Sequence, residues 1–178
     1  MSVLPIRLYG DPVLHRQAEE IDQFDSEISD LTADMIETAQ VDVGVGLAGP
    51  QVGEGRRLII VSNLDEEGTF HAYVNPVILD RGGTEVEEEG CLSVPDVRSK
   101  VDRSSWVKVQ AYDLSGNRLE LEATGLQARI FQHEIDHLDG ILFIQRIPRA
   151  KRFLLKGTLE RIRKESASWR SQDAGDRK

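Results

Sequence analysis

Two histidines and a glutamate in the segment "QHEIDH" have the spacing of a metal-dependent hydrolase. His133 and His137 are four residues apart, so in a helix both rings lie on one face, about one turn apart. Glu134 lies roughly 100° around such a helix, where its carboxylate can reach a water on the metal without being a ligand. The remainder of that face, Leu126 and Ile130, is apolar. Two solvated histidines are the alternative, but two unpartnered imidazoles would be costly to bury there, which favours a metal site.

The segment has the pattern His-Glu-x-x-His (HExxH), which supplies two metal ligands. A catalytic metal site built on it needs a third protein ligand and one open position. Cys91, the only cysteine, follows Gly90 and a strand, and thiolate is a strong ligand. Glu160 is the second candidate, as in metallopeptidases that take a glutamate from a following helix, although it lies among basic residues. A lone cysteine is often only a small buried apolar group. A Cys-His nucleophilic hydrolase would leave Glu134 without a role, and a structural zinc would need a fourth ligand.

A glycine-rich segment, "GVGLAG", runs from Gly44 to Gly49 and matches G-x-G-x-x-G. It follows a helix instead of a strand, and Pro50 and Gly53 do not open a helix, so the context of a dinucleotide-binding fingerprint is missing. We interpret it as a loop that offers backbone N–H and C=O groups to an extended ligand. Gln51 adds a neutral side-chain donor just after it. The alternative is a plain connector followed by a surface amide.

The elements that must position these residues can be read from periodicity and turn residues. Helices are expected over residues 25–40 and 124–138, and Thr124 with Gln127 forms a capping-box pattern at the start of the second. Strands are expected at 56–62, 71–79, 84–89, 106–113 and 118–124, the last two as a hairpin. A C-terminal helix is expected over about 148–165, starting at Pro148, with a frayed tail at 166–178. Because strands mostly precede the main helix, the sequence predicts an α+β fold with antiparallel sheets around the HExxH helix.

The chain as a whole is typical of a soluble globular protein. Its 178 residues predict a single domain over residues 1–165. No apolar run approaches the ~20 residues that cross a bilayer, and no signal peptide is apparent. A single cysteine fits a reducing compartment. The net charge of −9 argues against general nucleic-acid binding, yet residues 146–165 carry eight Lys or Arg against two Glu, a local +6. A solvated basic helix is the simpler interpretation of that segment, and a partner surface is the alternative.

Three blocks together resemble the peptide deformylase family. They are "GVGLAGPQ" at 44–51, "EGCLS" at 89–93 and "QHEIDH" at 132–137, in the order and spacing of that family. The segment "GDPVL" and the hairpin before the metal helix agree as well, so the resemblance covers roughly residues 5 to 165. One position departs from the family, which usually has alanine where this chain has Gly49.

The resemblance implies removal of the formyl group from N-formyl-methionyl peptides, with release of formate. It implies that one divalent metal ion is held by Cys91, His133 and His137, and that Glu134 moves the proton of the attacking water. Fe²⁺ is the native ion expected from the family, with Zn²⁺, Ni²⁺ or Co²⁺ as alternatives. The resemblance also assigns stabilisation of the carbonyl oxygen to the Gln51 side chain and the Leu92 N–H, and places Gly46 among the catalytic residues.

The resemblance also implies where the substrate and other partners bind. The peptide backbone is expected along Gly44–Gly46 and Gly90, and the methionine side chain against Val45, Leu126 and Ile130, for which ordinary core packing is the alternative. The basic C-terminal helix resembles the segment that bacterial relatives dock on the ribosome. No membrane or DNA partner is expected, and the expected location is the cytoplasm. Two alternatives remain at this point, an HExxH metallopeptidase and an inactive ribosome-binding homologue.

Overall fold

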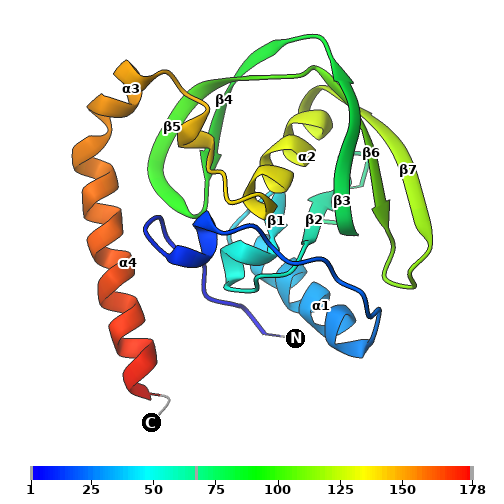
Figure 1. Cartoon of the computed structure of the whole chain (residues 1–178), viewed down its shortest axis with the longest axis horizontal. Coiled ribbons are helices and arrows are strands. Elements are labelled where there is room, and N and C mark those ends of the chain that lie inside the picture. Colours follow the sequence, from blue (N-terminus) through cyan, green and yellow to red (C-terminus); the bar gives the residue numbers. More distant parts are fainter. Residues whose placement is uncertain (1, 67, 177–178) are drawn as a thin grey trace.

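The computed structural model describes residues 2–66 and 68–176, with side chains up to residue 169. It has the predicted α+β architecture, in which antiparallel sheets surround the histidine-bearing helix (Figure 1). The larger sheet, in the order β1-β2-β3-β6-β7, consists of β1 (Gly46–Ala48), β2 (Leu58–Ser62), β3 (Phe70–Gly82), β6 (Trp106–Tyr112) and β7 (Arg118–Thr124). The smaller sheet pairs β4 (Glu85–Cys91) with β5 (Val94–Arg103). The helices are α1 (Ser26–Val41), α2 (Gly125–Leu138), α3 (Arg149–Leu154) and α4 (Lys156–Asp176), with 3₁₀ helices η1 (Pro12–His15), η2 (Gly49–Val52) and η3 (Phe143–Gln145).

Strand β2 is apolar almost throughout because both of its faces are covered. Ile59 and Val61 pack with Phe131 in the cluster between the larger sheet and α2. Leu58 and Ile60 belong to a second cluster, under α1. A strand buried on both faces reads as a continuous apolar run instead of an alternating one. The run "LIIV" therefore fixes β2 between the two helices, and it places α2 on the inner face of the sheet.

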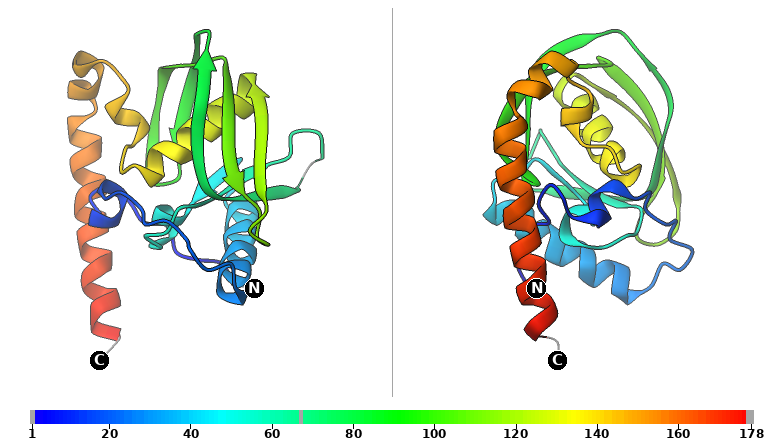
Figure 2. Two further views of the ribbon diagram at one scale, coloured as in Figure 1. Left: turned by 45° about the vertical axis from the view of Figure 1, so that its right-hand side comes forward. Right: turned by 60° about the vertical axis from the view of Figure 1, so that its left-hand side comes forward.

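Helix α2 lies between the two sheets, with the larger sheet on one side and β4 and β5 on the other (Figures 1 and 2). Its buried residues include polar and charged ones, each of which requires a partner. These residues are Arg129, Gln132, Glu134, Asp136 and His137. Buried polar and charged side chains lower stability unless they have hydrogen-bond partners or ligands. Their concentration on α2 therefore indicates that a functional site lies on this helix.

The sequence predicted where α1 and α2 begin to within one residue, but the capping hydrogen bonds predicted for α2 are absent. Asp25 caps α1, and its carboxylate accepts hydrogen bonds from the N–H groups of Glu27 and Ile28 at 3.0 and 3.3 Å. Thr124 does occupy the N-cap position of α2, yet its side chain makes no capping hydrogen bond. The capping box predicted from Thr124 and Gln127 is therefore wrong. The N–H of Gly125, a different donor at the same helix start, donates to the carbonyl of Ser105 at 2.9 Å, so tertiary structure satisfies one of the free N–H groups there.

Two strands, β5 and β1, were not predicted from the sequence. In β5 the buried residues are Val94, Val97, Val101 and Arg103, an uneven spacing that hides the period of two. The irregularity coincides with Asp96, whose φ of +62° bends the strand. Strand β1 is only three residues long and lies inside the glycine-rich segment, where the sequence indicated a loop.

The C-terminal segment also differs from expectation. In place of one helix over residues 148–165, the chain forms α3, breaks at Leu155 and continues as α4 to Asp176. The segment expected to fray is therefore helical up to Asp176, and residues 177–178 lie outside the described part. Ser166 donates from Oγ to the carbonyl of Leu8 at 3.2 Å, and the Arg7 guanidinium lies 4.5 Å from the centroid of the Trp169 ring. These contacts with the N-terminal segment hold α4 along the side of the molecule (Figure 2).

No helix in the described part of the chain combines the length and the apolar character that a membrane span needs.

Gly49 begins η2 at a point where the backbone is tightly enclosed. A Cβ added there would lie 2.7 Å from the carbonyl oxygen of Arg56 and 3.0 Å from that of Glu54. Carbonyl oxygens of a packed loop cannot move aside as a flexible side chain can. The space at position 49 in this structure therefore suits glycine and would be too small for the Cβ of an alanine unless residues 54–56 moved.

We expect Gly49→Ala to lower the free energy of unfolding by about 1–3 kcal/mol, the usual cost of overpacking. Gly55→Ala is the matched control, because no atom lies within 4 Å of a Cβ at that position, and its effect should stay within about 0.5 kcal/mol. Urea denaturation of the two variants checks this. An alanine at position 49 that left stability unchanged or raised it would show that the loop is not closed as described.

Candidate metal centre

Helix α2 brings the two predicted histidine ligands together. The ring centroids of His133 and His137 are 5.0 Å apart, with an interplanar angle of 75°. His137 is fully buried and the His133 side chain is 11% exposed, on the side of the pocket. The four-residue spacing therefore produces a pair of imidazoles that is shielded from bulk water and open on one side only.

Cys91 joins this pair from the smaller sheet. It ends β4, where the chain turns back and Cys91 pairs with Val94 of β5. Its Sγ lies 3.3 Å from Nε2 of His137, and the ligand atoms of Cys91, His133 and His137 all lie within 4.8 Å of one another. One thiolate and two imidazoles suit a soft or borderline divalent cation. In the described part of the chain, no fourth His, Cys, Asp or Glu joins the cluster, so it fits an open site better than a closed structural one.

Glu160 does not belong to the cluster. It lies on the surface of α4, where its carboxylate accepts a hydrogen bond from Arg163 at 2.8 Å. Its pKa is lowered by that hydrogen bond, as for an ordinary surface ion pair. The structure therefore contradicts the ligand set His133, His137 and Glu160 of the metallopeptidase alternative.

Glu89 supports His133 from behind. Oε2 of Glu89 lies 2.9 Å from Nδ1 of His133, and the same carboxylate accepts from Arg103 at 2.9 and 3.0 Å and from Arg129 at 2.7 Å. Burial alone would raise the pKa of Glu89, but hydrogen bonds from His133 and Arg103 outweigh it and hold the pKa well below its usual value. The ionised carboxylate fixes Nδ1 of His133 as a donor, which leaves Nε2 for a metal.

The two imidazoles have opposite pKa shifts. Burial lowers the pKa of His137 well below its usual value, so its ring is neutral, the form that binds metals. Burial acts in the same direction on His133, but hydrogen bonds to Cys91 and Glu89 outweigh it and hold the pKa of His133 well above its usual value. A cation that binds here would therefore displace a proton from His133.

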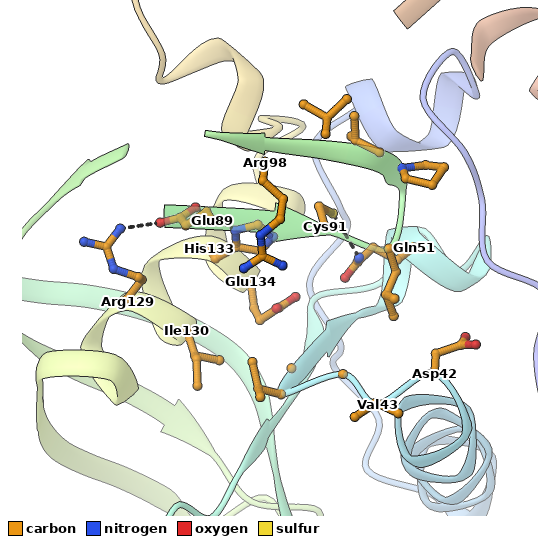
Figure 3. Close-up of a pocket in the computed structure, with 18 of the residues that line it drawn as sticks. Asp42, Val43, Gln51, Glu89, Cys91, Arg98, Arg129, Ile130, His133 and Glu134 are labelled. Carbon is orange, nitrogen blue, oxygen red and sulfur yellow. Dashed lines mark hydrogen bonds and ion pairs between the residues drawn. The ribbon is translucent and has the colours of Figure 1, made fainter. Parts of the chain in front are cut away.

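Glu134 faces the pocket beside the cluster without belonging to it (Figure 3). Burial raises its pKa to about 7. Its Oε2 is buried without a hydrogen-bond partner among the described residues, which is unusual for a native carboxylate unless a ligand completes it. A Cβ at Gly46 would lie 2.6 Å from Oε1 of Glu134 and 2.9 Å from Cγ2 of Ile130, so only glycine lets β1 approach α2 this closely.

Gln51 is held in one orientation by the backbone. Its Oε1 accepts from the N–H of Ala48 at 2.8 Å, so its amide nitrogen must face the other way. Nε2 lies 3.5 Å from Sγ of Cys91 and 3.5 Å from Oγ of Ser93. Leu92 lies in the turn directly after Cys91 and lines the same pocket. Gln51 and Leu92, to which the family resemblance assigns stabilisation of the carbonyl oxygen, therefore both lie close to the candidate ligand Cys91.

The cluster opens into a pocket of about 570 Å³ (Figure 3). Segments of β1, β4, β5 and α2 line it. Ile130 is buried in its wall, whereas Val45 and Leu126 are half-exposed at its mouth. The residues predicted to bind substrate all line this pocket, and they are Gly44, Val45, Gly46, Gly90, Leu126 and Ile130.

Sequence reasoning missed the charged support of the cluster. Glu89 stands last in a run of three glutamates and first in the "EGCLS" block, but the sequence assigned it no role, and its partners Arg103 and Arg129 are distant in sequence. One signal was available, because Glu89 and Cys91 are two residues apart and such residues share a face of a regular strand, although the pairing of β4 with β5 shifts register between them. Arg98 extends over the pocket in Figure 3, and its Nε donates to Oε1 of Glu88 at 2.6 Å. No pattern in the sequence indicated that Arg98 would lie there.

Comparison with known proteins gives a consistent result. A sequence profile described as polypeptide deformylase matches residues 3–153. A peptide deformylase of Acidobacterium capsulatum is 46% identical over 166 residues, which cover 92% of this chain and 96% of that protein. Among solved structures, the peptide deformylase of Thermus thermophilus has a TM-score of 0.87 at 44% identity, covering 92% of this chain and 99% of that chain. That of Legionella pneumophila has a TM-score of 0.85 at 34% identity, covering 93% and 98%.

The profile match extends over most of the chain, and the similar structures share the fold over more than nine-tenths of it. Together with the cluster and the pocket, these likenesses establish that this chain belongs to the polypeptide deformylase family.

Proposed function

We propose that this protein removes the formyl group from the N-terminal formyl-methionine of newly made polypeptides and releases formate. As a member of its family it is a hydrolase that acts on an amide. The observation that carries the finer proposal is the meeting of Cys91, His133 and His137 beside the buried carboxylate of Glu134, at the base of a pocket bordered by edge strands. Because formylated chains arise at the ribosome, the proposal also places the enzyme in the cytoplasm.

The three candidate ligands would hold one divalent cation. When bound, such a cation polarises a carbonyl oxygen and lowers the pKa of water in its coordination sphere. Thiolate with imidazole suits iron, zinc, nickel or cobalt. From the family resemblance we propose Fe²⁺ as the native ion, with Zn²⁺, Ni²⁺ or Co²⁺ as substitutes.

The peptide would bind along the edges of the two sheets. β1 lies at an edge of the larger sheet and β4 at an edge of the smaller one, and both border the pocket. An extended chain can add to such an edge through backbone hydrogen bonds, here with Gly44, Gly46 and Gly90. The methionine side chain would then lie against Ile130 and Leu126, with Val45 beside it. Support for this placement comes from the position of all these residues around one pocket.

Glu134 would move the proton that amide hydrolysis requires. Water adds to the formyl carbon and gives a proton to the Glu134 carboxylate, which then passes it to the leaving amine as the C–N bond breaks. The oxygen of the water ends in formate, and the proton ends on the new α-amine. The free Oε2 of Glu134 and its position at the pocket support this role.

Negative charge on the carbonyl oxygen would be stabilised by fixed donors. The amide nitrogen of Gln51 is aimed at the cluster because its oxygen is already held by Ala48. The N–H of Leu92, next to Cys91, would be the second donor. Donors that are fixed in advance need no reorganisation during the reaction, which is why such groups contribute strongly to catalysis.

We expect Glu134→Gln to lower the rate of formate release by roughly 10²–10⁴-fold, the usual contribution of a positioned proton-transfer group. The metal content should not change, because Glu134 is not among the ligands. Formate release from a short formyl-methionyl peptide and metal analysis, both on protein purified without oxygen, provide the measurement.

Glu160→Gln is the matched control for that experiment, since it changes a glutamate that lies outside the cluster, and both readouts should stay at wild-type values. Retained turnover in Glu134→Gln would contradict the role of this carboxylate. Wild-type protein that holds metal but releases no formate would favour the inactive ribosome-binding homologue.

We further propose the ribosome as a partner of the C-terminal helices. Arg149, Arg152, Lys156 and Arg163 border a groove between α3, α4 and Tyr9. Two large apolar side chains of α3 are strongly exposed: Phe153, which lines this groove, at 73%, and the next residue, Leu154, at 82%. Cations beside exposed aromatic and aliphatic groups are suited to RNA phosphates and bases.

Reversing three charges, as Arg149→Glu/Arg152→Glu/Lys156→Glu, should abolish co-sedimentation with ribosomes at moderate salt. Formate release from a short peptide should remain near the wild-type rate, because these residues do not line the catalytic pocket. The matched control Arg81→Glu/Lys108→Glu/Arg118→Glu changes the net charge equally on the larger sheet, and it should still co-sediment. Equal binding by both triple variants would reject this partner surface.

A further inference from the structure

Arg146 closes a chain of buried charges that leads to the candidate metal ligands. It lies just after η3, in the link between α2 and α3. Its guanidinium makes a two-pronged contact with Asp136 of α2, from Nε to Oδ2 at 3.1 Å and from Nη2 to Oδ1 at 2.5 Å. The Arg146 side chain is 42% exposed, whereas that of Asp136 is 10% exposed. The contact therefore reaches from the surface into the buried polar part of α2.

From Asp136 an unbroken series of ion pairs and hydrogen bonds leads to the candidate metal ligand His133. Oδ2 of Asp136 accepts from Nη1 of Arg103 at 2.5 Å. Arg103 uses its two other nitrogens on Glu89, Nε at 2.9 Å and Nη2 at 3.0 Å. Glu89 then contacts Nδ1 of His133 at 2.9 Å. Cations and carboxylates alternate along this path, as a buried set of charges requires.

The position of Arg103 depends on a balance between two carboxylates. Glu89 and Asp136 lie on different sides of its guanidinium, and all three groups are nearly excluded from water. With Arg146 present, Asp136 has a second cation and both of its oxygens are occupied. Without Arg146, Oδ1 of Asp136 would lose its partner, and this carboxylate would draw more strongly on Arg103. Glu89 would then be held less firmly, and so would the imidazole it orients.

We propose that Arg146 is a positioning residue for the metal centre, acting on His133 through Asp136, Arg103 and Glu89. Arg146 does not border the catalytic pocket, so an effect on the centre would not come from contact with substrate. The simpler alternative is that Arg146 only fastens the link after η3 to α2. In that case its loss would reduce stability and leave the metal ligands unchanged.

The test measures the metal affinity and the ligand geometry of the centre in the absence of substrate. Arg146→Met is loaded with Co²⁺ without oxygen, its metal affinity is measured by chelator competition, and its visible absorption spectrum reports the geometry of the thiolate and imidazole ligands. We expect the metal dissociation constant to rise about tenfold, at the lower end of the range for groups behind the ligands. The thiolate-to-cobalt and ligand-field bands should shift with it. Arg146→Lys keeps the charge but not the two-pronged contact, so it should give an intermediate value.

Arg161→Met is the matched control, because Arg161 is similarly exposed at 48% and also contacts two carboxylates, those of Asp96 and Glu165. It should leave both readouts at wild-type values. Wild-type affinity and spectrum in Arg146→Met, or the same change in Arg161→Met, would overturn the inference. If Arg146→Met fails to fold, the two readouts on Arg146→Lys decide.

This inference shares with the proposed function only the metal site. Because the readouts are affinity and spectrum, Arg146 can prove irrelevant while formate release stands. Equally, Arg146 can prove important in a protein that releases no formate.

Discussion

The carboxylate of Glu89 ties together the elements that form the candidate metal centre. It belongs to β4, its arginine partners come from β5 and α2, and it contacts the ring of His133 directly. An unpaired carboxylate in this position would be expensive to bury, so the two arginines and the imidazole must converge on it. That convergence holds the smaller sheet against α2. It also places Cys91, two residues further along β4, beside the histidines. The same ion pairs thus shape both the fold and the site.

Close packing sets the remaining geometry. α2 can lie between the sheets because β2 offers an apolar face to it and a second apolar face to α1. β1 can approach α2 only because Gly46 has no side chain, and this brings Glu134 to the base of the pocket. Gly49 permits a similarly close approach by the loop at residues 54–56. Glycines at these points are demanded by contact and not by flexibility, which explains why one glycine-rich segment serves as strand, turn and pocket wall.

The sequence predicted features that depend on local pattern and missed those that depend on tertiary pairing. The HExxH spacing, the helix expected over residues 25–40 and the β6–β7 hairpin depend on patterns among neighbouring residues, and the structure contains all three. The irregular β5 could not be recognised, because the bend at Asp96 disrupts its alternation. The capping box at Thr124 is absent, and the carbonyl of Ser105, between β5 and β6, accepts from the N–H of Gly125 at that helix start. The C-terminal helix extends beyond its expected end because Trp169 and Ser166 dock on the N-terminal segment. Glu89 was not singled out, because the arginines that pair with it lie far away in the sequence and its two-residue spacing from Cys91 was the one local indication of its role.

The central feature of the proposed centre is one sulfur and two imidazole nitrogens that bind a single cation. X-ray absorption at the metal edge of zinc-loaded protein tests this most directly, because it counts and ranges the ligand atoms. The account predicts one sulfur at about 2.3 Å and two imidazole nitrogens at about 2.0–2.1 Å, with the sulfur lost in Cys91→Ala. A spectrum without sulfur in the unaltered protein, or one that Cys91→Ala leaves unchanged, would contradict it.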